Sequence, residues 1–356
     1  MAQKELWKGN EAVARAAILA GCRYFFGYPI TPQNEIPEYM AAHLPEVGGC
    51  FLQSESEVAA INMVYGAAGA GARVMTSSSS PGISLKQEGI TYLVGSELPA
   101  VIVNVMRGGP GLGTIQPAQG DYFQATRGGG NGDYRTVVLA PSTVQEAADL
   151  TQEAFDIADQ YRNPVLLLMD GMIGQMMEGM VWHEIPRREL PPKRWATTAT
   201  EGKRGKNIIN SWRSDGTGLE VHNLHLAEKW RAMEENEVRW EERGTEEAEL
   251  IFVAYGTTAR LAAAAMKELE KQGIRCGLLR PISLWPYPST RLCALAERTS
   301  VRAVFTVELS LGQMVEDVRL AVEGVKPVGF FGRAGGVIPT PHEIAEQARA
   351  FLEQWR

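Results

Sequence analysis

The stretch Phe51–Gly71, FLQSESEVAAINMVYGAAGAG, predicts a short apolar strand, an acidic turn and a helix of small residues. After Glu57, the residues Ala60, Val64 and Ala68 recur at helical spacing, so this helix is expected to pack closely against a sheet or a partner. A carboxylate one turn inside the N-terminus of a helix is stabilised by free backbone N–H groups and by the helix dipole. Glu57 is therefore interpreted either as such a helix-start residue or as the working acid of a functional site.

Helices and short apolar strands alternate on both sides of this stretch. The expected strands of the first part of the chain cover 22–28, 49–53, 73–76, 100–106, 136–140 and 164–169. The expected helices, besides the one after Glu57, cover 10–21, 34–42, 83–95 and 144–160. Evenly apolar strands separated by helices indicate a buried, mostly parallel sheet, and therefore the α/β fold class.

Composition divides the chain into three parts. From 180 to 247 the sequence becomes polar and rich in Pro, Arg and Trp, which indicates a connector that is partly helical near its end. Regular alternation of strands and helices resumes at Leu250. We predict a first α/β domain at 1–180, a connector at 181–247 and a smaller α/β domain at 248–356.

The overall composition excludes several classes of protein. The chain has 356 residues, of which 45% are hydrophobic and 22% charged, as in ordinary globular proteins. Its formal net charge of −7 argues against a general nucleic-acid or anionic-membrane surface. No stretch reaches the roughly 18 uncharged apolar residues that a membrane span needs, and no secretory signal pattern is present, so a cytoplasmic location is expected.

Neither the cysteines nor the histidines form a metal-binding pattern. Cys22, Cys50, Cys276 and Cys293 stand far apart and lack the close spacing that iron–sulfur ligation uses. The histidines form no HExxH motif. We expect reduced core thiols and no metal site in this chain.

Four segments follow predicted strands directly, namely Tyr28–Thr31, Glu55–Glu57, Thr76–Gly82 and Arg107–Thr114. In parallel α/β sheets, ligands bind at the carboxyl ends of the strands. One folded sheet would therefore bring several of these segments to a common rim. The serines of the third segment are expected to cap the helix that follows it.

Arg107 is the sharpest signal at this rim. An arginine just past an apolar strand, followed by glycines that let the backbone approach closely, suits bidentate recognition of a carboxylate or phosphate. A structural ion pair is the alternative. Thr31 is interpreted either as a turn hydroxyl or as a ligand. The glycines of Gly109–Gly113 form no dinucleotide fingerprint, because their spacing is GxGxG and no helix is expected to follow.

Several motifs stand out when they are taken together. The first domain carries GYPITPQNEIPEYM, QSESEVAAINMVYGAAGAGARVMTSSSSPG and VIVNVMRGGPGLG with PAQGDYF. The second domain carries ELSLGQMVEDVRLAVEG and FFGRAGGVIPTPHEI. Over nearly the whole chain, these motifs resemble the alpha subunit of multi-subunit 2-oxoacid:ferredoxin oxidoreductases, and the most similar subgroup is the 2-oxoisovalerate, or branched-chain, type.

The resemblance implies a pyrimidine-type thiamine diphosphate-binding parallel-sheet domain and a smaller α/β domain like the C-terminal domain of transketolase. Such enzymes use thiamine diphosphate and coenzyme A to convert a 2-oxoacid oxidatively to an acyl-CoA and carbon dioxide, with electrons passing through iron–sulfur clusters to ferredoxin. A branched-chain substrate such as 2-oxoisovalerate is favoured. Two alternatives stay open: 2-oxoglutarate or an aryl 2-oxoacid as substrate, and a non-catalytic structural subunit that has kept the fold.

The resemblance also assigns roles to residues. Glu57 matches the glutamate that hydrogen-bonds N1′ of the cofactor's aminopyrimidine, since the family's acid stands nine residues before a helix glycine, here Gly66. A carboxyl at N1′ enables the 4′-nitrogen to take a proton from the thiazolium ring. Thr31 is expected to contact the substrate, and Arg107 to hold the substrate carboxylate. The other expected cofactor-binding residues are Tyr28, Pro29 and Ile30.

The resemblance implies partner subunits as well. The diphosphate half of a thiamine site needs GDG and a later Asn to hold Mg²⁺, and Asp170-Gly171-Met172 lacks the first glycine. A beta subunit is therefore expected to bring the diphosphate site, Mg²⁺ and a [4Fe-4S] cluster. Gamma and ferredoxin-like delta subunits would complete a hetero-oligomer that reduces ferredoxin. The small-residue helix after Glu57 is expected to form part of the interface with the beta subunit.

Overall fold

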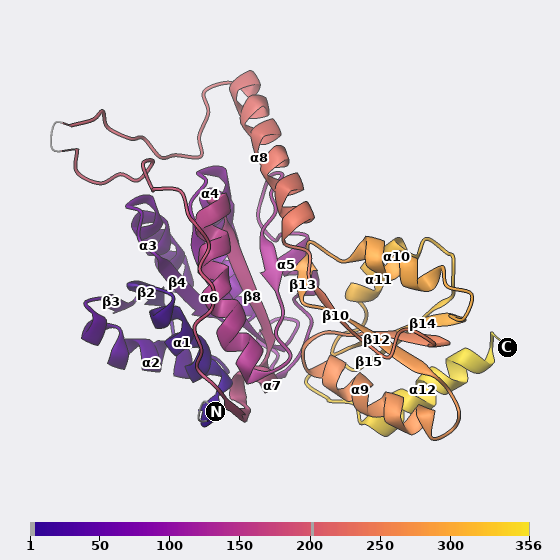
Figure 1. The fold of residues 1–356 in the computed structure, drawn as a ribbon. Coiled ribbons are helices and arrows are strands. Elements are labelled where there is room, and N and C mark those ends of the chain that lie inside the picture. Colours follow the sequence, from indigo (N-terminus) through magenta and orange to yellow (C-terminus); the bar gives the residue numbers. More distant parts are fainter. Residues whose placement is uncertain (1–3, 201–202, 356) are drawn as a thin grey trace.

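Two large sheets organise the computed structural model of this protein, which describes residues 4–200 and 203–355 (Figure 1). An eight-stranded sheet belongs mainly to the first domain, and a five-stranded sheet belongs to the second. A small additional sheet pairs β1 (Glu5–Lys8) with β9 (Met177–Met180). The α/β fold class predicted from the sequence is confirmed.

The eight-stranded sheet has a parallel centre. Its parallel strands are β2 (Tyr24–Gly27), β3 (Cys50–Gln53), β4 (Val74–Ser78), β5 (Ala100–Gly108), β7 (Val137–Leu139) and β8 (Pro164–Asp170). They lie in the order β7-β8-β5-β4-β2-β3. Two antiparallel strands join them, β6 (Thr114–Pro117) beside β5 and β13 (Ser283–Trp285) beside β7. Because β13 comes from the second half of the chain, the two domains share this sheet.

Helices cover both faces of this sheet, which is why its strands are apolar throughout. The major helices are α1 (Gly9–Leu19), α2 (Glu35–His43), α3 (Glu57–Gly69), α4 (Pro81–Gly95) and α6 (Val144–Tyr161). Short helices are η1 (Pro45–Val47), α5 (Tyr122–Thr126) and α7 (Gly171–Gln175). Alternate residues of β5 face opposite cores: Val101 and Val103 pack with α1, α2 and α6, whereas Ile102 and Met106 pack with α3 and α4.

The second domain repeats this layered arrangement on a smaller scale. Its strands are β10 (Trp240–Arg243), β11 (Leu250–Val253), β12 (Cys276–Pro281), β14 (Ala303–Glu308) and β15 (Val328–Gly332), in the order β10-β12-β11-β14-β15. Its helices are α9 (Gly256–Glu270), α10 (Ser289–Ala296), α11 (Met314–Val322) and α12 (Pro341–Glu353). All neighbouring strands are parallel except β10, which comes from the segment predicted to be the connector.

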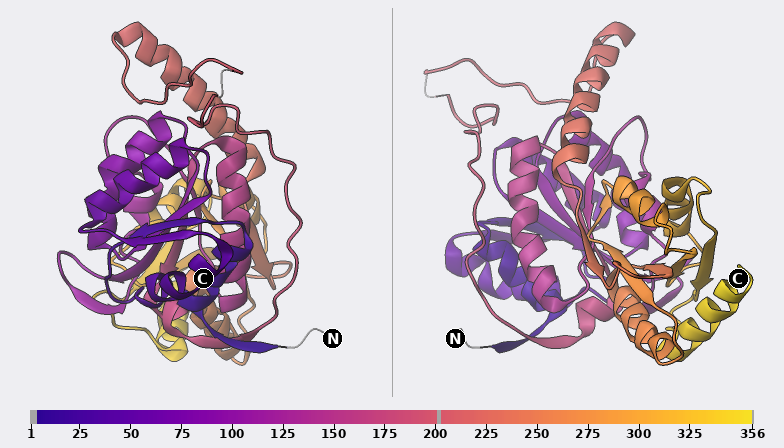
Figure 2. Two further views of the ribbon diagram at one scale, coloured as in Figure 1. Left: turned by 90° about the vertical axis from the view of Figure 1, so that its left-hand side faces the viewer. Right: turned by 45° about the vertical axis from the view of Figure 1, so that its right-hand side comes forward.

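The connector crosses the outside of the first domain. Its described residues between β9 and α8 (Gly216–Asn236) form neither helix nor strand, and they run along α6 before α8 projects beyond the sheet (Figures 1 and 2). The backbone N–H of Arg188 donates to Asp156 of α6 at 3.1 Å. The predicted helix near the end of the connector is thus confirmed as α8.

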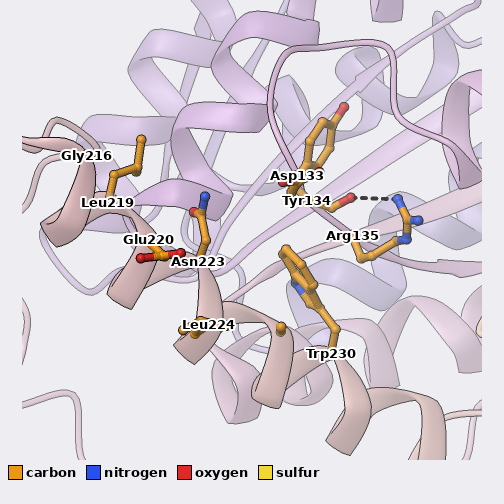
Figure 3. Close-up of a pocket in the computed structure, with 10 residues that line it drawn as sticks. Asp133, Tyr134, Arg135, Gly216, Leu219, Glu220, Asn223, Leu224 and Trp230 are labelled. Atoms are coloured by element: carbon orange, nitrogen blue, oxygen red, sulfur yellow. Dashed lines mark hydrogen bonds between the residues drawn. The ribbon is translucent and has the colours of Figure 1, made fainter.

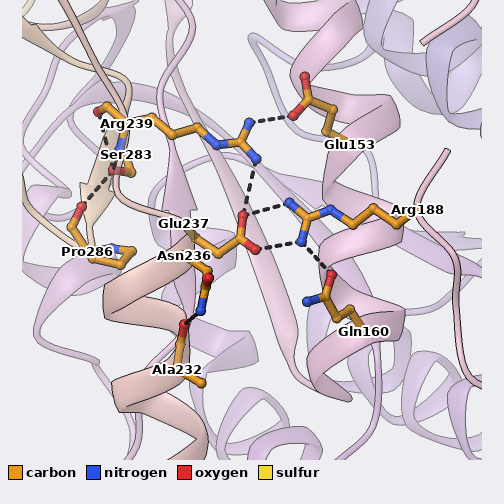
Figure 4. A network of polar contacts seen from close by, with 9 residues as sticks. All are labelled: Glu153, Gln160, Arg188, Ala232, Asn236, Glu237, Arg239, Ser283 and Pro286. Atoms are coloured by element: carbon orange, nitrogen blue, oxygen red, sulfur yellow. Dashed lines mark hydrogen bonds and ion pairs between the residues drawn. The ribbon is translucent and has the colours of Figure 1, made fainter. Parts of the chain in front are cut away.

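A buried carboxylate fastens both ends of the connector to the first domain (Figure 4). Glu237, just after α8, accepts hydrogen bonds from both terminal nitrogens of Arg188 at 2.5 and 2.8 Å and from Arg239 at 3.2 Å. Arg239 also pairs with Glu153 of α6. Burial alone would raise the pKa of Glu237, but the hydrogen bonds and charge of Arg188 outweigh it and lower that pKa.

Candidate functional site

The carboxyl ends of β2, β3, β4 and β5 bring four of the predicted segments together, as expected for a parallel sheet. Glu57 follows β3 and lies beside Ser78 at the end of β4. Arg107 near the end of β5 reaches Thr31, which follows β2. The convergence predicted from the strand order is therefore present in the fold.

Glu57 is the first residue of α3, not a residue one turn inside the helix as the sequence suggested. Ser56 is the N-cap, and its hydroxyl accepts a hydrogen bond from the N–H of Ala59 at 3.2 Å. The side chain of Glu57 is buried, with the residue only 5% exposed, and Oε1 accepts a long hydrogen bond of 3.4 Å from Ser78. The side chain therefore starts at the positive end of the dipole of α3.

Gly82 in α4 allows this carboxylate to sit where it does. A methyl group at position 82 would lie 2.4 Å from Oε1 of Glu57 and 2.0 Å from the hydroxyl of Ser78. The glycine of SSSSPG is thus required for close approach between the start of α4 and the carboxylate. α4 begins at Pro81, two residues before the predicted start at 83.

Arg107 lies within β5 and is only 6% exposed, so the prediction that it stands in the loop past the strand is wrong. β5 extends further because β6, which the sequence did not reveal, pairs with its end. The Nη1 of Arg107 donates to the carbonyl of Thr31 at 3.0 Å, while Nε has no hydrogen-bond partner in the described part of the chain. Arg107 forms no ion pair with any described residue, which removes the structural ion pair as its explanation.

Gln33 anchors the loop that carries Thr31, and sequence reasoning missed it. This fully buried amide donates to the carbonyl of Tyr28 at 3.3 Å and accepts from Ser77 of β4 at 2.5 Å. Its backbone N–H also donates to Ile30. Of the loop residues predicted to contact the cofactor, Tyr28 and Pro29 are exposed and Ile30 is half-buried. In the sequence, the position of Gln33 directly after YPITP was the available sign that it supports this loop.

Ser80 ties α4 to β5 through an unusual backbone conformation. Its φ of 21° is rare for a non-glycine residue, and the backbone N–H donates to Asn104 at 3.1 Å. Its hydroxyl donates to Asp121 at 2.6 Å and accepts from the N–H of Arg107 at 3.1 Å. Although Ser80 occupies the N-cap position of α4, its side chain does not cap the helix, so the capping role predicted for these serines is wrong for Ser80.

Asp121 completes this arrangement and was not singled out from the sequence. It accepts hydrogen bonds from Ser80 and, at 2.9 Å, from Asn104. Burial raises the pKa of Asp121, and these two hydrogen bonds oppose that shift without cancelling it. Asp121 therefore holds the Ser80 hydroxyl that accepts from the backbone N–H of Arg107, and these hydrogen bonds fix the backbone position from which the Arg107 side chain extends.

Two cavities open on either side of this rim. One of about 360 Å³ is lined by Thr31, Glu35 and Gln116, among others. The other, of about 620 Å³, lies between the two domains and is lined by residues that include Ser80, Asp121 and Leu311. A third cavity of about 560 Å³ lies between α8 and the segment 133–135, away from the rim (Figure 3). The first two have the size of small-molecule sites. Of the predicted site residues, Thr31 lines the first cavity, whereas Glu57 and Arg107 line neither of the two.

Asp170, the only acid of the incomplete GDG-like segment, is already engaged by the protein. It is fully buried at the end of β8 and accepts hydrogen bonds from the N–H and hydroxyl of Thr257 at 2.8 and 2.6 Å. It also accepts from the N–H of Ile173. Burial raises the pKa of Asp170, and these hydrogen bonds oppose the increase. Asp170 therefore joins the domains instead of facing a cavity.

Two family models cover most of this chain. Residues 15–243 match the thiamine diphosphate-binding domain of pyruvate flavodoxin/ferredoxin oxidoreductase. Residues 248–344 match core domain II of pyruvate:ferredoxin oxidoreductase. The chain belongs to the 2-oxoacid:ferredoxin oxidoreductase family.

Individual members of the family agree with this assignment. Ketoisovalerate oxidoreductase subunit VorB of Methanothermobacter thermautotrophicus is 50% identical over 345 residues, which cover 97% of each chain. 2-Oxoglutarate synthase subunit KorA of Archaeoglobus fulgidus is 41% identical and covers 93% of this chain and 95% of its own. The solved 2-oxoglutarate:ferredoxin oxidoreductase from Magnetococcus marinus, with 2-oxoglutarate, coenzyme A and succinyl-CoA bound, superposes with a TM-score of 0.87 at 27% identity. That superposition covers 99% of this chain and 66% of the solved chain.

These similarities confirm the predicted family, its alpha-type subunit, the two-domain fold class and the thiamine diphosphate-dependent 2-oxoacid:ferredoxin oxidoreductase function. The VorB relative also agrees with the branched-chain subgroup. In the described residues, no helix combines the length and apolar character needed to cross a membrane. The roles of single residues, the domain boundaries and the individual partner subunits stay predictions.

Proposed function

We propose that this chain is the alpha subunit of a 2-oxoisovalerate:ferredoxin oxidoreductase and that Glu57 is its contact to the aminopyrimidine of thiamine diphosphate. The observation that supports this most strongly is the buried Glu57 carboxylate at the rim of the parallel sheet, with a single long hydrogen bond among the described residues and with Gly82 leaving space beside it. A structural carboxylate at this depth would have several donors.

The residues around Glu57 fit the pyrimidine half of the cofactor. When bound, thiamine diphosphate supplies a carbon nucleophile for the 2-oxoacid, and its ring nitrogens move the necessary proton. Glu57 would hold a proton at N1′, since its carboxylate is fixed by the start of α3 and retains acceptor capacity. Ser78 would steady the same carboxylate from β4.

Arg107 and Thr31 fit the substrate carboxylate. The guanidinium of Arg107 has five N–H donors, and Nε is unpaired in the described residues, so it can bind an oxyanion without leaving Thr31. The neighbouring cavity of about 360 Å³ is lined by Thr31 and bordered by the apolar side chains of Ile115 and Met172. A short aliphatic substrate side chain suits such a lining.

The remainder of the active site would come from partner chains. Asp170 is saturated by Thr257 and Ile173, and no group of three or more His, Cys, Asp or Glu side chains in the described residues could hold a metal ion. We propose that a beta subunit supplies the diphosphate and Mg²⁺ site and a [4Fe-4S] cluster. Gamma and ferredoxin-like delta subunits would complete a cytoplasmic hetero-oligomer that uses coenzyme A and reduces ferredoxin.

The outer surface of α3 is a suitable place for the beta subunit. Val58 is 45% exposed at the start of α3, and Leu52 at the end of the neighbouring β3 is 40% exposed. A side chain added at Gly66 would meet nothing within 4 Å. An apolar, small-residue surface directly beside Glu57 would let a second chain approach the cofactor closely.

The test is purification of the native complex followed by ferredoxin-reduction assays with 2-oxoisovalerate, 2-oxoglutarate, pyruvate and aryl 2-oxoacids. We expect the highest kcat/KM with 2-oxoisovalerate. A higher value with another 2-oxoacid would overturn the substrate assignment. A complex whose alpha subunit carries Glu57→Ala should lose activity. If it turned over at the normal rate, the catalytic assignment of Glu57 would be overturned and a structural subunit would be favoured.

A further inference from the structure

One face of α4 lies against α3 along the stripe Gly82, Lys86 and Gly89, which are spaced one helical turn apart. Gly82 approaches Glu57, and a methyl group at Gly89 would lie 2.5 Å from Ile61 of α3. Lys86, one turn after Gly82 and one turn before Gly89, is therefore placed inside the contact between the two helices. A lysine is an unusual residue between two glycines that exist to allow close packing.

The ammonium group of Lys86 is completely buried and has no hydrogen-bond partner in the described residues. Burying an unpaired ammonium group is costly, so a lysine at such a place needs a reason. Burial lowers the pKa of Lys86 to about 8, and the charge of Glu57 opposes this shift. The charge of Glu57 thus acts on Lys86, because Glu57 lies against Gly82, one turn away from Lys86 on the same face of α4.

Other titratable groups near α4 are either engaged elsewhere or directed away. Tyr65 of α3 shares a hydrogen bond with Ser96, and Arg107 of β5 points to Thr31. Asp170 of β8 is held by Thr257. β4 contains no titratable side chain, and Glu88, the other charged residue of α4, is exposed and accepts a hydrogen bond from Tyr92.

Two further groups reach α4 from other segments. Asp121 is held by Ser80 and Asn104, and the hydroxyl of Tyr134 donates to Gln87.

Building on the proposed role of Glu57, we propose that Lys86 is a positioning residue that keeps Glu57 ionised, so that the proton shared with the cofactor ring resides on the ring nitrogen. An ammonium group close to a carboxylate favours the charged form of that carboxylate, and the effect is strong where water is excluded. Lys86 and Glu57 form no direct ion pair among the described residues. The carboxylate consequently stays available to a ligand while it feels the positive charge.

A double-mutant cycle tests the electrostatic coupling without any assay of activity. Glu57→Gln, Lys86→Met and the double variant are made in the full chain, and their unfolding temperatures are measured at pH 7. Methionine matches the length of the lysine stem and removes the charge. We expect Lys86→Met to raise the unfolding temperature by about 2 °C more in the Glu57→Gln background than in the wild type, because Glu57 no longer offsets the ammonium charge. Additive effects would overturn the proposal.

The pH profile of kcat/KM in the assembled complex tests the consequence for catalysis. Without the cation, Glu57 takes up its proton more readily, so Lys86→Met should move the acid limb upward by about one pH unit, equivalent to a tenfold loss on that limb. Lys86→Arg should restore the wild-type limb. Lys267→Met, at an exposed lysine of α9, is the matched control and should leave the profile unchanged.

The outcomes separate this inference from the proposed function. If Glu57→Gln abolishes turnover while Lys86→Met leaves the acid limb in place, Lys86 has no positioning role and the assignment of Glu57 stands. If Glu57→Gln retains normal turnover, the proposed function fails and the inference fails with it. A shifted limb that Lys86→Arg restores supports both.

Discussion

Two buried carboxylates of this chain have opposite surroundings. Glu237, at the end of the connector, accepts three hydrogen bonds from two arginines (Figure 4). Glu57, at the rim of the parallel sheet, accepts one long hydrogen bond from Ser78 and faces an ammonium group that has no hydrogen-bond partner of its own in the described chain. The first site is saturated and the second is incomplete.

The difference separates a structural site from a functional one. A buried ion pair whose hydrogen bonds are all satisfied has no capacity left for a ligand, and removing one partner lowers the free energy of unfolding. An unsaturated carboxylate beside an unpaired cation costs stability in the isolated chain, and such groups are kept where a ligand completes them. If this comparison is correct, substitutions at the two sites must fail in different ways.

Glu57→Gln should give the largest effect on activity. The amide retains the shape of the side chain but cannot hold the proton, so 2-oxoacid-dependent ferredoxin reduction should fall by at least about two orders of magnitude, a typical contribution of an acid–base group. Subunit association, measured by size-exclusion chromatography, should be unaffected. The matched control is Glu55→Gln, two residues earlier and exposed, which should retain normal activity. Equal losses in both variants would contradict the role of Glu57.

Glu237→Gln should instead destabilise the fold by about 2 kcal/mol, because it leaves Arg188 and Arg239 without their carboxylate. The pKa of Glu237 is lowered from 4.5, so its stabilising contribution is present above pH 4.5 and is lost as the pH falls through the lowered pKa. Denaturant unfolding at pH 7 and at pH 3.5 should therefore show a smaller difference at the lower pH. If Glu237→Gln lowered kcat without lowering the stability, Glu237 would be a functional residue and the comparison with Glu57 would be contradicted.

Lys86→Met should stabilise the chain by about 1 to 2 kcal/mol at pH 7, since it removes a buried unpaired charge. The pKa of Lys86 is lowered from 10.5 to about 8, so the cost of the ammonium group is present in full below pH 8 and disappears as the pH rises from about 8 to 10.5. The gain from the substitution should therefore shrink over that range in thermal unfolding. A gain in stability that is independent of pH would mean that Lys86→Met acts through packing and not through the loss of the charge.

Arg107→Lys should give the smallest of these effects, a several-fold increase in the KM for the 2-oxoacid. A single ammonium group cannot hold both Thr31 and a substrate carboxylate as a guanidinium can. Steady-state kinetics of the complex would measure the change. The KM for coenzyme A serves as the internal control, and an unchanged KM for the 2-oxoacid would remove Arg107 from the carboxylate site.

The sequence predicted the parallel sheet, the meeting of its loops and the choice of Glu57, because these follow from strand order and local pattern. It could not reveal β13 or the pair of β1 with β9, since each depends on pairing between segments far apart in the chain. Arg107 was misplaced for the same reason: β6 lengthens β5 past it.

The supporting residues of the site were also beyond the sequence. Gln33 and Asp121 have no motif of their own, and their roles come from partners on other elements. Lys86 looked like an ordinary helix residue, and only its packing between Gly82 and Gly89 shows that its charge is buried.

The most direct test of the account is an experimental structure of the assembled complex with thiamine diphosphate bound. We predict that a carboxylate oxygen of Glu57 lies about 2.6–3.2 Å from N1′ of the aminopyrimidine, with the diphosphate and Mg²⁺ held by a partner subunit. A structure in which N1′ contacts another residue and Glu57 points away from the ring would contradict it.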